Sequence, residues 1–286
     1  MFKKVKVVSL FLFAFFIIVQ FSDITHGQNL FTPEGVLFMK NKSFDDSKSA
    51  RQEILDLYKG LRLTDVCDGM DGVGLQDIGL MDRNIRPLFR DMEHFKHIIV
   101  GFALTACYVP TDKRVMPTPE TFDELKNEGY GLAPSPWEKL IIPNTVIVID
   151  ASETGDVGFI GSNNCMGWLV SGAIGVVTNA GARDTDELIK IQAPVYTKYI
   201  SRGIRPGRLR LESYNRPISC GGVLVFPGDV IVADGDGVIV VPREKAIDVG
   251  KIAKGINEDD QKSRLQKYKK LGIPADFTVE KYEEKK

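Results

Sequence analysis

The chain has 286 residues, of which 43% are hydrophobic, and this content is ordinary for a globular protein with a sizeable core. Its 37 basic and 38 acidic residues give a formal net charge of −1, whereas nucleic-acid binding usually requires a strongly basic face. We therefore expect a globular protein without a nucleic-acid partner.

The beginning of the chain has the composition of an export signal. Lysines among the first six residues precede the apolar run 7–21. Thr25 and Gly27 are small residues of the kind found at signal-peptidase sites. The run of roughly 15 residues is shorter than the ~20 that span a bilayer, which favours a cleaved signal over an uncleaved anchor. We predict a signal peptide over residues 1–27, no stable membrane insertion of the mature chain, and a periplasmic or secreted location.

The segment after the signal combines a polar arm with helical and strand patterns. Beyond Ser49, apolar residues such as Ile54, Leu57 and Leu61 recur at helical spacing. In chain order we expect an irregular arm (28–48), a helix from Ser49, a second helix capped by Thr64 and Asp65 and ended by the glycines of 69–74, a strand (97–108), a helix (118–130), a loop (134–143) and a buried strand (145–150).

The central segment alternates strands and helices. The expected elements are a strand (157–160), a helix (163–171), a strand (174–178), a tight turn (179–182), a helix (185–191) and a strand (195–200). This β-α-β-α-β order predicts a parallel-rich sheet with helices packed on it, in an α/β domain that extends over residues 49–272.

The last segment reads as a strand meander followed by a long helix. Strands are expected over 222–226, 230–233 and 238–241, joined by turn residues at 227–229 and by Asp-Gly-Asp-Gly at 234–237. A calcium loop would need a longer ligand series that ends in Glu, so the Asp-Gly repeat is interpreted as a turn. A helix over 243–271 and a charged tail over 273–286 complete the chain.

Several common functional motifs are absent from the sequence. Without the signal, His94 and His97 are the only histidines, which disfavours a histidine metal site or a Ser-His-Asp triad; a partly exposed polar pair is the simpler interpretation. Neither a GxxxxGK[ST] loop nor a GxGxxG loop between a strand and a helix occurs, so nucleotide and S-adenosylmethionine sites lack their usual motif.

The four cysteines show no CxxC spacing, so neither a zinc knuckle nor a redox motif is predicted. Export would allow disulfides, and the sequence does not choose among the possible pairings. We expect most of these residues to be small buried apolar side chains. They are Cys67, Cys107, Cys165 and Cys220.

Arg183 and Asp184 stand between an expected strand and an expected helix. Residues at the carboxyl end of a parallel strand face the crevice where ligands bind in open α/β sheets. A guanidinium can pair with a carboxylate ligand, and the neighbouring carboxylate can bind a hard divalent cation. Since Asp184 also suits a helix cap, the residues alone leave open either a capped helix with an exposed arginine or a ligand site.

Several motifs also occur together in the order found in one protein family. Over residues 61–272 the chain resembles the ribonuclease activity regulator A-like family, which includes the 4-hydroxy-4-methyl-2-oxoglutarate aldolases and members labelled dimethylmenaquinone methyltransferase-like. The motifs that carry the resemblance are Thr64–Asp68, Gly101–Thr105, Gly161, Gly172, Gly175–Val177, Gly181, Arg183-Asp184, Pro227–Val230 and Asp236–Val238.

The resemblance implies a swivelling phosphohistidine-type sandwich with N-terminal and C-terminal helices, assembled as a homotrimer or hexamer. It implies that Asp184 ligates Mg²⁺ or Mn²⁺ and that Arg183 contacts the oxoacid and stabilises an enolate. The substrate carboxylate would be held by the loop that opens the preceding helix, namely Gly161, Ser162, Asn163 and Asn164, since N–H groups at a helix start form an anion site. The activity implied is a metal-dependent carbon–carbon lyase, an aldolase or decarboxylase of a small oxoacid.

The chain departs from the aldolases at Ser162, where they carry an acid. A serine can hydrogen-bond a water molecule but cannot take up a proton near neutral pH. This departure puts aldol cleavage of the family substrate in doubt, and Asn163 and Asn164 suggest either a more polar substrate or simple helix capping. The alternative function is a non-catalytic oxoacid-binding or protein-regulatory member of the same family.

Two further charged groups are candidates for roles in an assembly. In the aldolases a second acid comes from the C-terminal helix of a neighbouring subunit, and the sequence offers Glu258, Asp259 and Asp260 without choosing among them. A cluster of arginines would line an interface, steer anionic substrates or belong to a solvated surface. These arginines are Arg202, Arg205, Arg208, Arg210 and Arg216.

Overall fold

The computed structural model describes residues 37–112, 131, 133–151, 156–276, 278 and 279. Every element below belongs to one compact unit, residues 39–286. The expected signal peptide and the expected helix over 118–130 lie outside the described residues. Within the described residues, no helix is both long enough and apolar enough to cross a bilayer.

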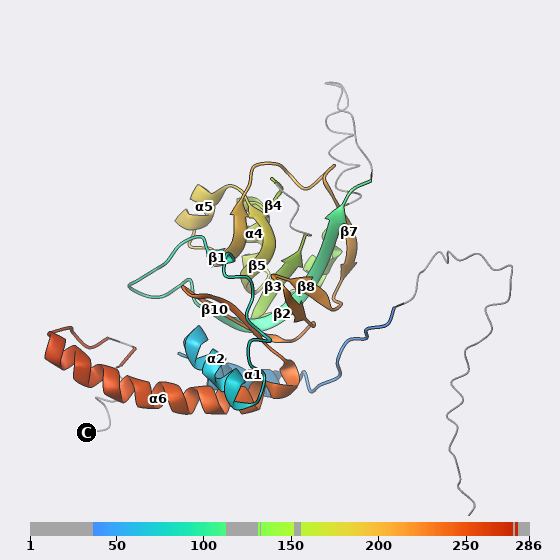
Figure 1. Cartoon of the computed structure of the whole chain (residues 1–286). Helices are drawn as coiled ribbons and strands as arrows, with labels where there is room; N and C mark the ends of the chain where they lie inside the picture. The colour runs from blue at the N-terminus through green and yellow to red at the C-terminus, as the bar shows by residue number, and fades with distance from the viewer. Residues whose placement is uncertain (1–36, 113–130, 132, 152–155, 277, 280–286) are drawn as a thin grey trace, which may run out of the picture. The chain divides into compact units, whose positions relative to one another are not determined.

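In the described part of the chain, nine strands form one mixed sheet in the order β1-β6-β5-β3-β2-β10-β11, with β4 beside β5 and β7 beside β2. The pairs among β2, β3, β5 and β6 are parallel, as is β4 with β5, and the other pairs are antiparallel. The end strands β1 and β11 contact each other, so the sheet is nearly closed (Figure 1). The strands are β1 (Arg86–Pro87), β2 (Ile99–Pro110), β3 (Thr145–Asp150), β4 (Gly158–Ile160), β5 (Ala173–Ala182), β6 (Val195–Ile200), β7 (Leu209–Tyr214), β10 (Val230–Asp234) and β11 (Gly237–Val241).

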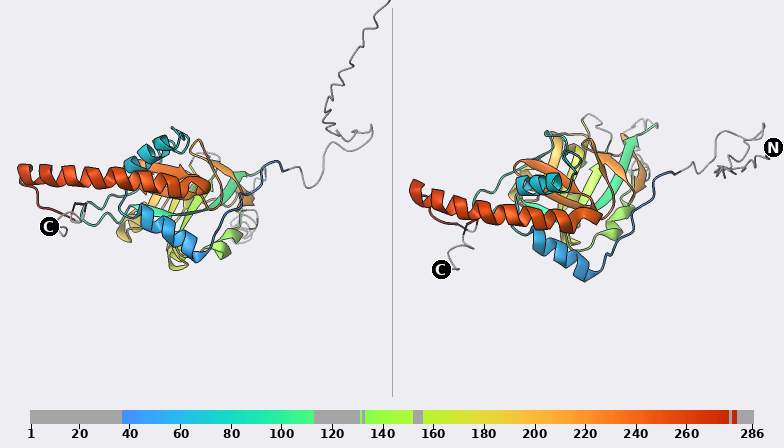
Figure 2. Two further views of the ribbon diagram at one scale, coloured as in Figure 1. Left: turned by 90° about the horizontal axis from the view of Figure 1, so that it is seen from below. Right: turned by 60° about the horizontal axis from the view of Figure 1, so that its bottom comes forward.

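Helices pack on this sheet in two groups. α1 and α2 lie along the long helix α6 (Figure 2), with α2 against β10 and β11 and α1 against β2, while α4 packs on β5 and α5 packs on α4. A short antiparallel pair, β8 (Ile218–Cys220) and β9 (Val223–Val225), stands apart from the main sheet. The helices are α1 (Lys48–Tyr58), α2 (Leu63–Gly72), the 3₁₀ turn η2 (Pro136–Leu140), α4 (Ser162–Val170), α5 (Thr185–Lys190), the 3₁₀ turn η3 (Arg243–Lys245) and α6 (Ala246–Leu271).

The inner strands are apolar at successive positions because both of their faces are covered. In β3 the residues Thr145–Ile149 are all buried, as a parallel strand between two packed layers requires. On one face Trp137, Trp168 and Leu188 join a core cluster with the strands. Burial of these large side chains supplies most of the favourable free energy of folding.

Most expected elements of the central segment are confirmed, and the turn expected there is wrong. The expected turn at 179–182 is the last part of β5, because Gly181 and Ala182 pair with β4 on one side and β6 on the other. Pairing with two neighbours outweighs the turn preference of Asn179 and Gly181. The arginine-rich segment contains β7, which pairs with β2 and which the sequence pattern did not predict.

The second helix also begins differently from the prediction. Thr64 and Asp65 lie inside α2, and Arg62 is the residue that precedes it. The Asp65 carboxylate accepts a hydrogen bond from the Arg62 backbone N–H at 2.9 Å, so Asp65 closes a capping box from the third helical position.

The α/β class is confirmed, and the sheet is mixed: its central strands pair in parallel, and β1, β7, β10 and β11 form antiparallel pairs. The phosphohistidine-domain type stays a prediction. Among the cysteines, Cys165 and Cys220 are buried, and Cys67 and Cys107 are half-buried; all four are free thiols. Burial raises the pKa of Cys107 and of Cys165 to about 12, so both behave as neutral apolar groups.

Candidate functional site

Arg183 and Asp184 lie at the carboxyl edge of the parallel strands, where β5 ends and α5 begins. The backbone N–H of Arg183 donates to the carbonyl of Ile160 at 2.8 Å, which ties this segment to the end of β4. The start of α4 follows Ile160 after one residue, so two helix starts meet the Arg-Asp pair. This is the edge at which open α/β sheets bind ligands.

The conformation of Asp184 distinguishes between the two interpretations that the sequence left open. Its φ of 56° and ψ of 40° are left-handed, which costs a non-glycine residue about 1–2 kcal/mol. The carboxylate makes no cap hydrogen bond to α5, and Oδ2 instead accepts from the backbone N–H of Ser162 at 3.2 Å. The strained backbone therefore turns the carboxylate away from its own helix and toward the start of α4.

Two glycines make room for this pair. A Cβ at Gly158 would lie 2.7 Å from Cβ of Arg183, and a Cβ at Gly161 would lie 3.0 Å from Oδ2 of Asp184. The Arg183 Nε and Asp184 Oδ1 are 3.6 Å apart, and their side chains are 33% and 37% exposed. The two charged groups thus lie together, half in solvent, and both remain reachable by a ligand.

The start of α4 has the features of an anion site. Gly161 is the residue before the helix and has no side chain. It therefore cannot cap the first backbone N–H groups of α4. Asn163 is exposed and Asn164 is half-buried inside the first turn, and the cap position is Gly161 rather than either of them. The Ser162 N–H donates to Asp184, and the N–H groups of Asn163 and Asn164 lie in the same first turn.

The donor set limits the kind of metal site that Asp184 can form. Among the described residues, no group of three or more His, Cys, Asp or Glu side chains lies together as a ligand cluster. Mg²⁺ is commonly held by one or two carboxylates, with water and ligand oxygens completing its shell, whereas zinc requires a full set of protein donors. Asp184 fits a water-rich Mg²⁺ or Mn²⁺ site and does not fit an all-protein cage.

The three candidate acids of α6 differ in their ion-pair partners. Asp260 forms an ion pair with Arg62 at 2.6 Å, and Asp259 forms one with Lys262 at 2.8 Å. Glu258 is exposed and has no hydrogen-bond or ion-pair partner among the described residues. Of the three, Glu258 is the acid without a partner among the described residues.

The arginines of the β7 region are used within the protomer. Arg205 is buried against the rings of Tyr108 and Phe159, and the others bind nearby oxygens. Their partners are Asp156 for Arg202, the Ile204 carbonyl for Arg208, Asp112 for Arg210 and the Met39 carbonyl for Arg216.

The structure gives two residues a place that the sequence analysis did not predict. Gly158 was not singled out, although an isolated glycine in a strand often marks a close approach, and here Arg183 makes it. His97 was expected to be partly exposed beside His94, but it is only 3% exposed, and its Nδ1 accepts the backbone N–H of Asp91 at 3.1 Å. Burial lowers the pKa of His97, so the ring is neutral at pH 7.

The chain is similar to several known proteins. Protein DlpA of Legionella pneumophila is 27% identical over 187 residues, which cover 65% of this chain and 27% of DlpA. A putative 4-hydroxy-4-methyl-2-oxoglutarate aldolase of Halalkalibacterium halodurans is 35% identical over 123 residues, which cover 42% of this chain and 56% of that relative. The chain thus spans little more than half, or less, of the length of these two relatives.

A solved structure shows the same fold. RraAS2 of Streptomyces coelicolor, described as an unusual member of the RNase ES inhibitor RraA protein family, superposes with a TM-score of 0.60 at 21% identity, covering 75% of this chain and 98% of RraAS2. The family model described as RraA-like, Aldolase/RraA, matches residues 63–240, which is more than half of the chain. This protein therefore belongs to the RraA-like family.

Proposed function

We propose that the protein is a divalent-metal-dependent carbon–carbon lyase that cleaves or decarboxylates a small oxoacid through an enolate. The observation that carries this proposal is the left-handed Asp184, whose carboxylate leaves its own helix and lies beside Arg183 at the start of α4. A residue that served only to cap α5 would not need this conformation. The aldolase relative supports the same reaction class.

The protein groups at this edge would bind and orient the oxoacid. The planar guanidinium of Arg183 can donate two hydrogen bonds to a carboxylate or to an enolate oxygen. The N–H groups of Asn163 and Asn164 would hold the anionic end of the substrate at the positive end of α4, while the Ser162 N–H holds the Asp184 carboxylate. Together they place the negative charge that develops during cleavage next to fixed positive charge.

Asp184 would hold Mg²⁺ or Mn²⁺, which when bound supplies a Lewis acid for the keto oxygen. Ser162 would position a water molecule there by hydrogen bonding, and it would not transfer a proton near neutral pH. We therefore expect slow cleavage of the hydroxy-oxoglutarate type of substrate. Asn163 favours an oxoacid with additional hydroxyl groups, because its exposed amide can hydrogen-bond them.

The assembly and the cellular location belong to the same proposal. A homotrimer or hexamer would bring an acid of one α6 to the Arg183–Asp184 pair of another protomer. Glu258 is the acid we assign to this position, because Asp259 and Asp260 already have partners in their own protomer. We also propose a periplasmic or secreted location, on the signal pattern of residues 1–27.

The test is pyruvate release from oxaloacetate and from 4-hydroxy-2-oxoacids, measured after chelation and after return of Mg²⁺ or Mn²⁺. Metal-dependent release that is lost in Asp184→Asn and in Arg183→Lys supports the lyase. Asp186→Asn is the matched control, because Asp186 is an exposed acid of the same helix start. Release that persists in Asp184→Asn would overturn the proposal.

Ser162 favours a second candidate, a family member that binds an oxoacid without turning it over. Without an acid at this position, the metal and Arg183 can hold the ligand while proton transfer fails. Calorimetric binding of pyruvate in the presence of Mg²⁺, lost in Asp184→Asn and without any turnover, would support this function. A gain of pyruvate release in Ser162→Asp would identify the missing proton carrier.

A further inference from the structure

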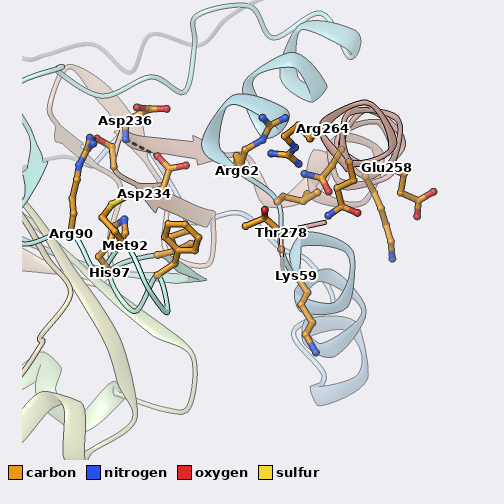
Figure 3. Close-up of a pocket in the computed structure, with 18 of the residues that line it drawn as sticks. Lys59, Arg62, Arg90, Met92, His97, Asp234, Asp236, Glu258, Arg264 and Thr278 are labelled. Carbon is orange, nitrogen blue, oxygen red and sulfur yellow. Dashed lines mark hydrogen bonds between the residues drawn. The ribbon is translucent and has the colours of Figure 1, made fainter. Parts of the chain in front are cut away.

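A recess lies at the opposite edge of the sheet from Arg183 and Asp184. It is a cavity of about 840 Å³ between α6 and the segment that leads into β2 (Figure 3). The turn after β10 borders it, and Ala233 at the end of β10 pairs with Ile99 at the start of β2. Arg183 follows the end of β5, which runs parallel to β2 through β3, so the cavity and the Arg-Asp pair occupy opposite ends of the strands.

The sheet side of the cavity contains a buried histidine with a free nitrogen. His97 lines the cavity although it is 3% exposed, and its Nδ1 already accepts the Asp91 N–H. A neutral ring in this state carries its proton on Nε2. Nε2 has no partner among the described residues, so it is an N–H donor available to a ligand in the cavity.

The helix side presents a second set of buried polar groups. Gln261 is 8% exposed, lines the cavity, and makes no hydrogen bond with the described residues. Nε of Arg264, one turn further along α6, is buried and has no hydrogen-bond partner among them either. Buried polar atoms are normally paired, and an unpaired one costs about 1–3 kcal/mol, so the Arg264 side chain and the unbonded amide of Gln261 beside it leave room for a hydrogen-bonding ligand.

The rest of the lining combines apolar side chains and further cations with the carboxylates of Asp234 and Asp236, of which Asp234 accepts backbone N–H groups. Leu61, Met92, Phe95 and Ile98 give it an apolar surface. Lys59 and Lys254 add cations that have no acidic partner among the described residues, in addition to Arg264. Figure 3 shows His97 and Met92 on one side of the recess and Arg264 and Lys59 on the other. A cavity of this size and composition is typical of small-molecule sites.

We propose that this cavity binds a small organic carboxylate with an apolar body. The carboxylate accepts hydrogen bonds from Arg264 and from the amide of Gln261, and the apolar body lies against Met92 and Phe95. Nε2 of His97 donates to a second oxygen of the ligand. Glu258 stands at the rim of the cavity and takes no part in holding the carboxylate. The site does not depend on Asp184 or on a metal ion.

The test is isothermal titration of the full chain with 3-phenylpropionate and, separately, with its uncharged analogue 3-phenylpropanamide. The charged compound should bind at least about tenfold more tightly, because a hydrogen bond to a charged group contributes more than one to a neutral group. Arg264→Gln should remove this preference for the charged compound, and Gln261→Leu should weaken binding of the carboxylate. Lys267→Gln is the matched control, since Lys267 is an exposed cation on the same helix outside the cavity.

Three results would overturn the proposal. Equal affinities for the acid and the amide would show that no carboxylate is recognised. Unchanged selectivity in Arg264→Gln, with circular dichroism confirming a folded protein, would place the binding elsewhere. Absence of binding to the wild-type chain would also reject the site. In that case a second copy of the chain could fill the cavity. Light scattering of the wild type and of Met92→Arg would detect this as a lower mass of the variant.

Discussion

The two ends of the sheet hold polar groups in different ways. At the carboxyl edge, Arg183 and Asp184 are adjacent in sequence, about one-third exposed, and set against two glycines. At the opposite edge, His97 and Gln261 are far apart in sequence, almost fully buried, and brought together by the packing of α6. The first edge is a local motif, and the second is a product of the tertiary structure.

This difference predicts how each edge responds to substitution. The local motif depends on a few backbone positions that leave space for its side chains, so a single added methyl group should disturb it. The assembled edge depends on buried ion pairs and amides that join α2 to α6, so removal of one charge should disturb that edge. Mutations at the two ends should therefore act independently, since they share no partners.

The largest effect is expected for Gly181→Ala at the carboxyl edge. Its Cβ would lie 2.0 Å from Oγ of Ser201 and 2.9 Å from the carbonyl of Val157, so strands β4, β5 and β6 must separate. We expect a loss of about 3 kcal/mol of unfolding free energy, measured by urea denaturation. The double variant Gly181→Ala/Ser201→Gly should recover part of the loss. An unchanged urea midpoint would show that the strands accommodate the added methyl group without a loss of stability.

The next effect belongs to the assembled edge. Asp65 is 1% exposed, and its carboxylate pairs with Arg62 and accepts from the Asn257 amide at 2.6 Å. Asp65→Asn should cost about 2–3 kcal/mol, because it leaves donors facing a neutral amide inside the protein. Asp68→Asn, at an exposed position of the same helix, should cost less than about 0.5 kcal/mol. Equal costs in the two variants would mean that the buried pair does not join α2 to α6.

Gly158→Ala should separate activity from stability. The added Cβ would lie within 3.0 Å of three side-chain carbons of Arg183, whose flexible chain can move away. We expect a cost of about 1 kcal/mol in stability and a loss of oxoacid turnover or binding of about tenfold or more, because the guanidinium is displaced. Gly167→Ala is the control, since nothing lies within 4 Å of its Cβ and alanine favours the helix. Retention of full binding in Gly158→Ala would argue against a role for Arg183.

The smallest effect is expected away from both edges and gives a baseline for them. Lys198 lies 2.7 Å from Asp82, and this hydrogen bond, with the Asn84 N–H, lowers the pKa of Asp82. A lowered folded pKa means that the pair stabilises the protein above the unfolded value of about 4 and that this stabilisation disappears as the pH falls through the folded value. Asp82→Asn should therefore cost about 0.5 kcal/mol at pH 7 and nothing near pH 2, as measured by thermal unfolding. A cost that persists at pH 2 would exclude this electrostatic origin.

Much of the carboxyl edge was predictable because the residues that form it are close together in the sequence. A strand, two charged residues and a helix start follow one another within a few positions, and the pattern placed Arg183 and Asp184 correctly at the end of β5. The pattern failed where pairing with neighbours decides the outcome. The sequence around Gly181 was interpreted as a turn and is the last part of a strand, and β7 was missed because its partner strand, β2, is distant in the chain.

The sequence by itself determined the α/β class and the family, since these follow from periodicity and from short motifs, and it singled out Arg183 and Asp184 as the candidates for an oxoacid site. Only the tertiary structure decided that Asp184 turns from its helix, that Asp259 and Asp260 have ion-pair partners whereas Glu258 has none among the described residues, and that His97 is buried. The physical reason is that exposure, backbone strain and the partner of a charge depend on residues distant in the chain. Packing brings those residues together, and no local pattern records which ones will meet.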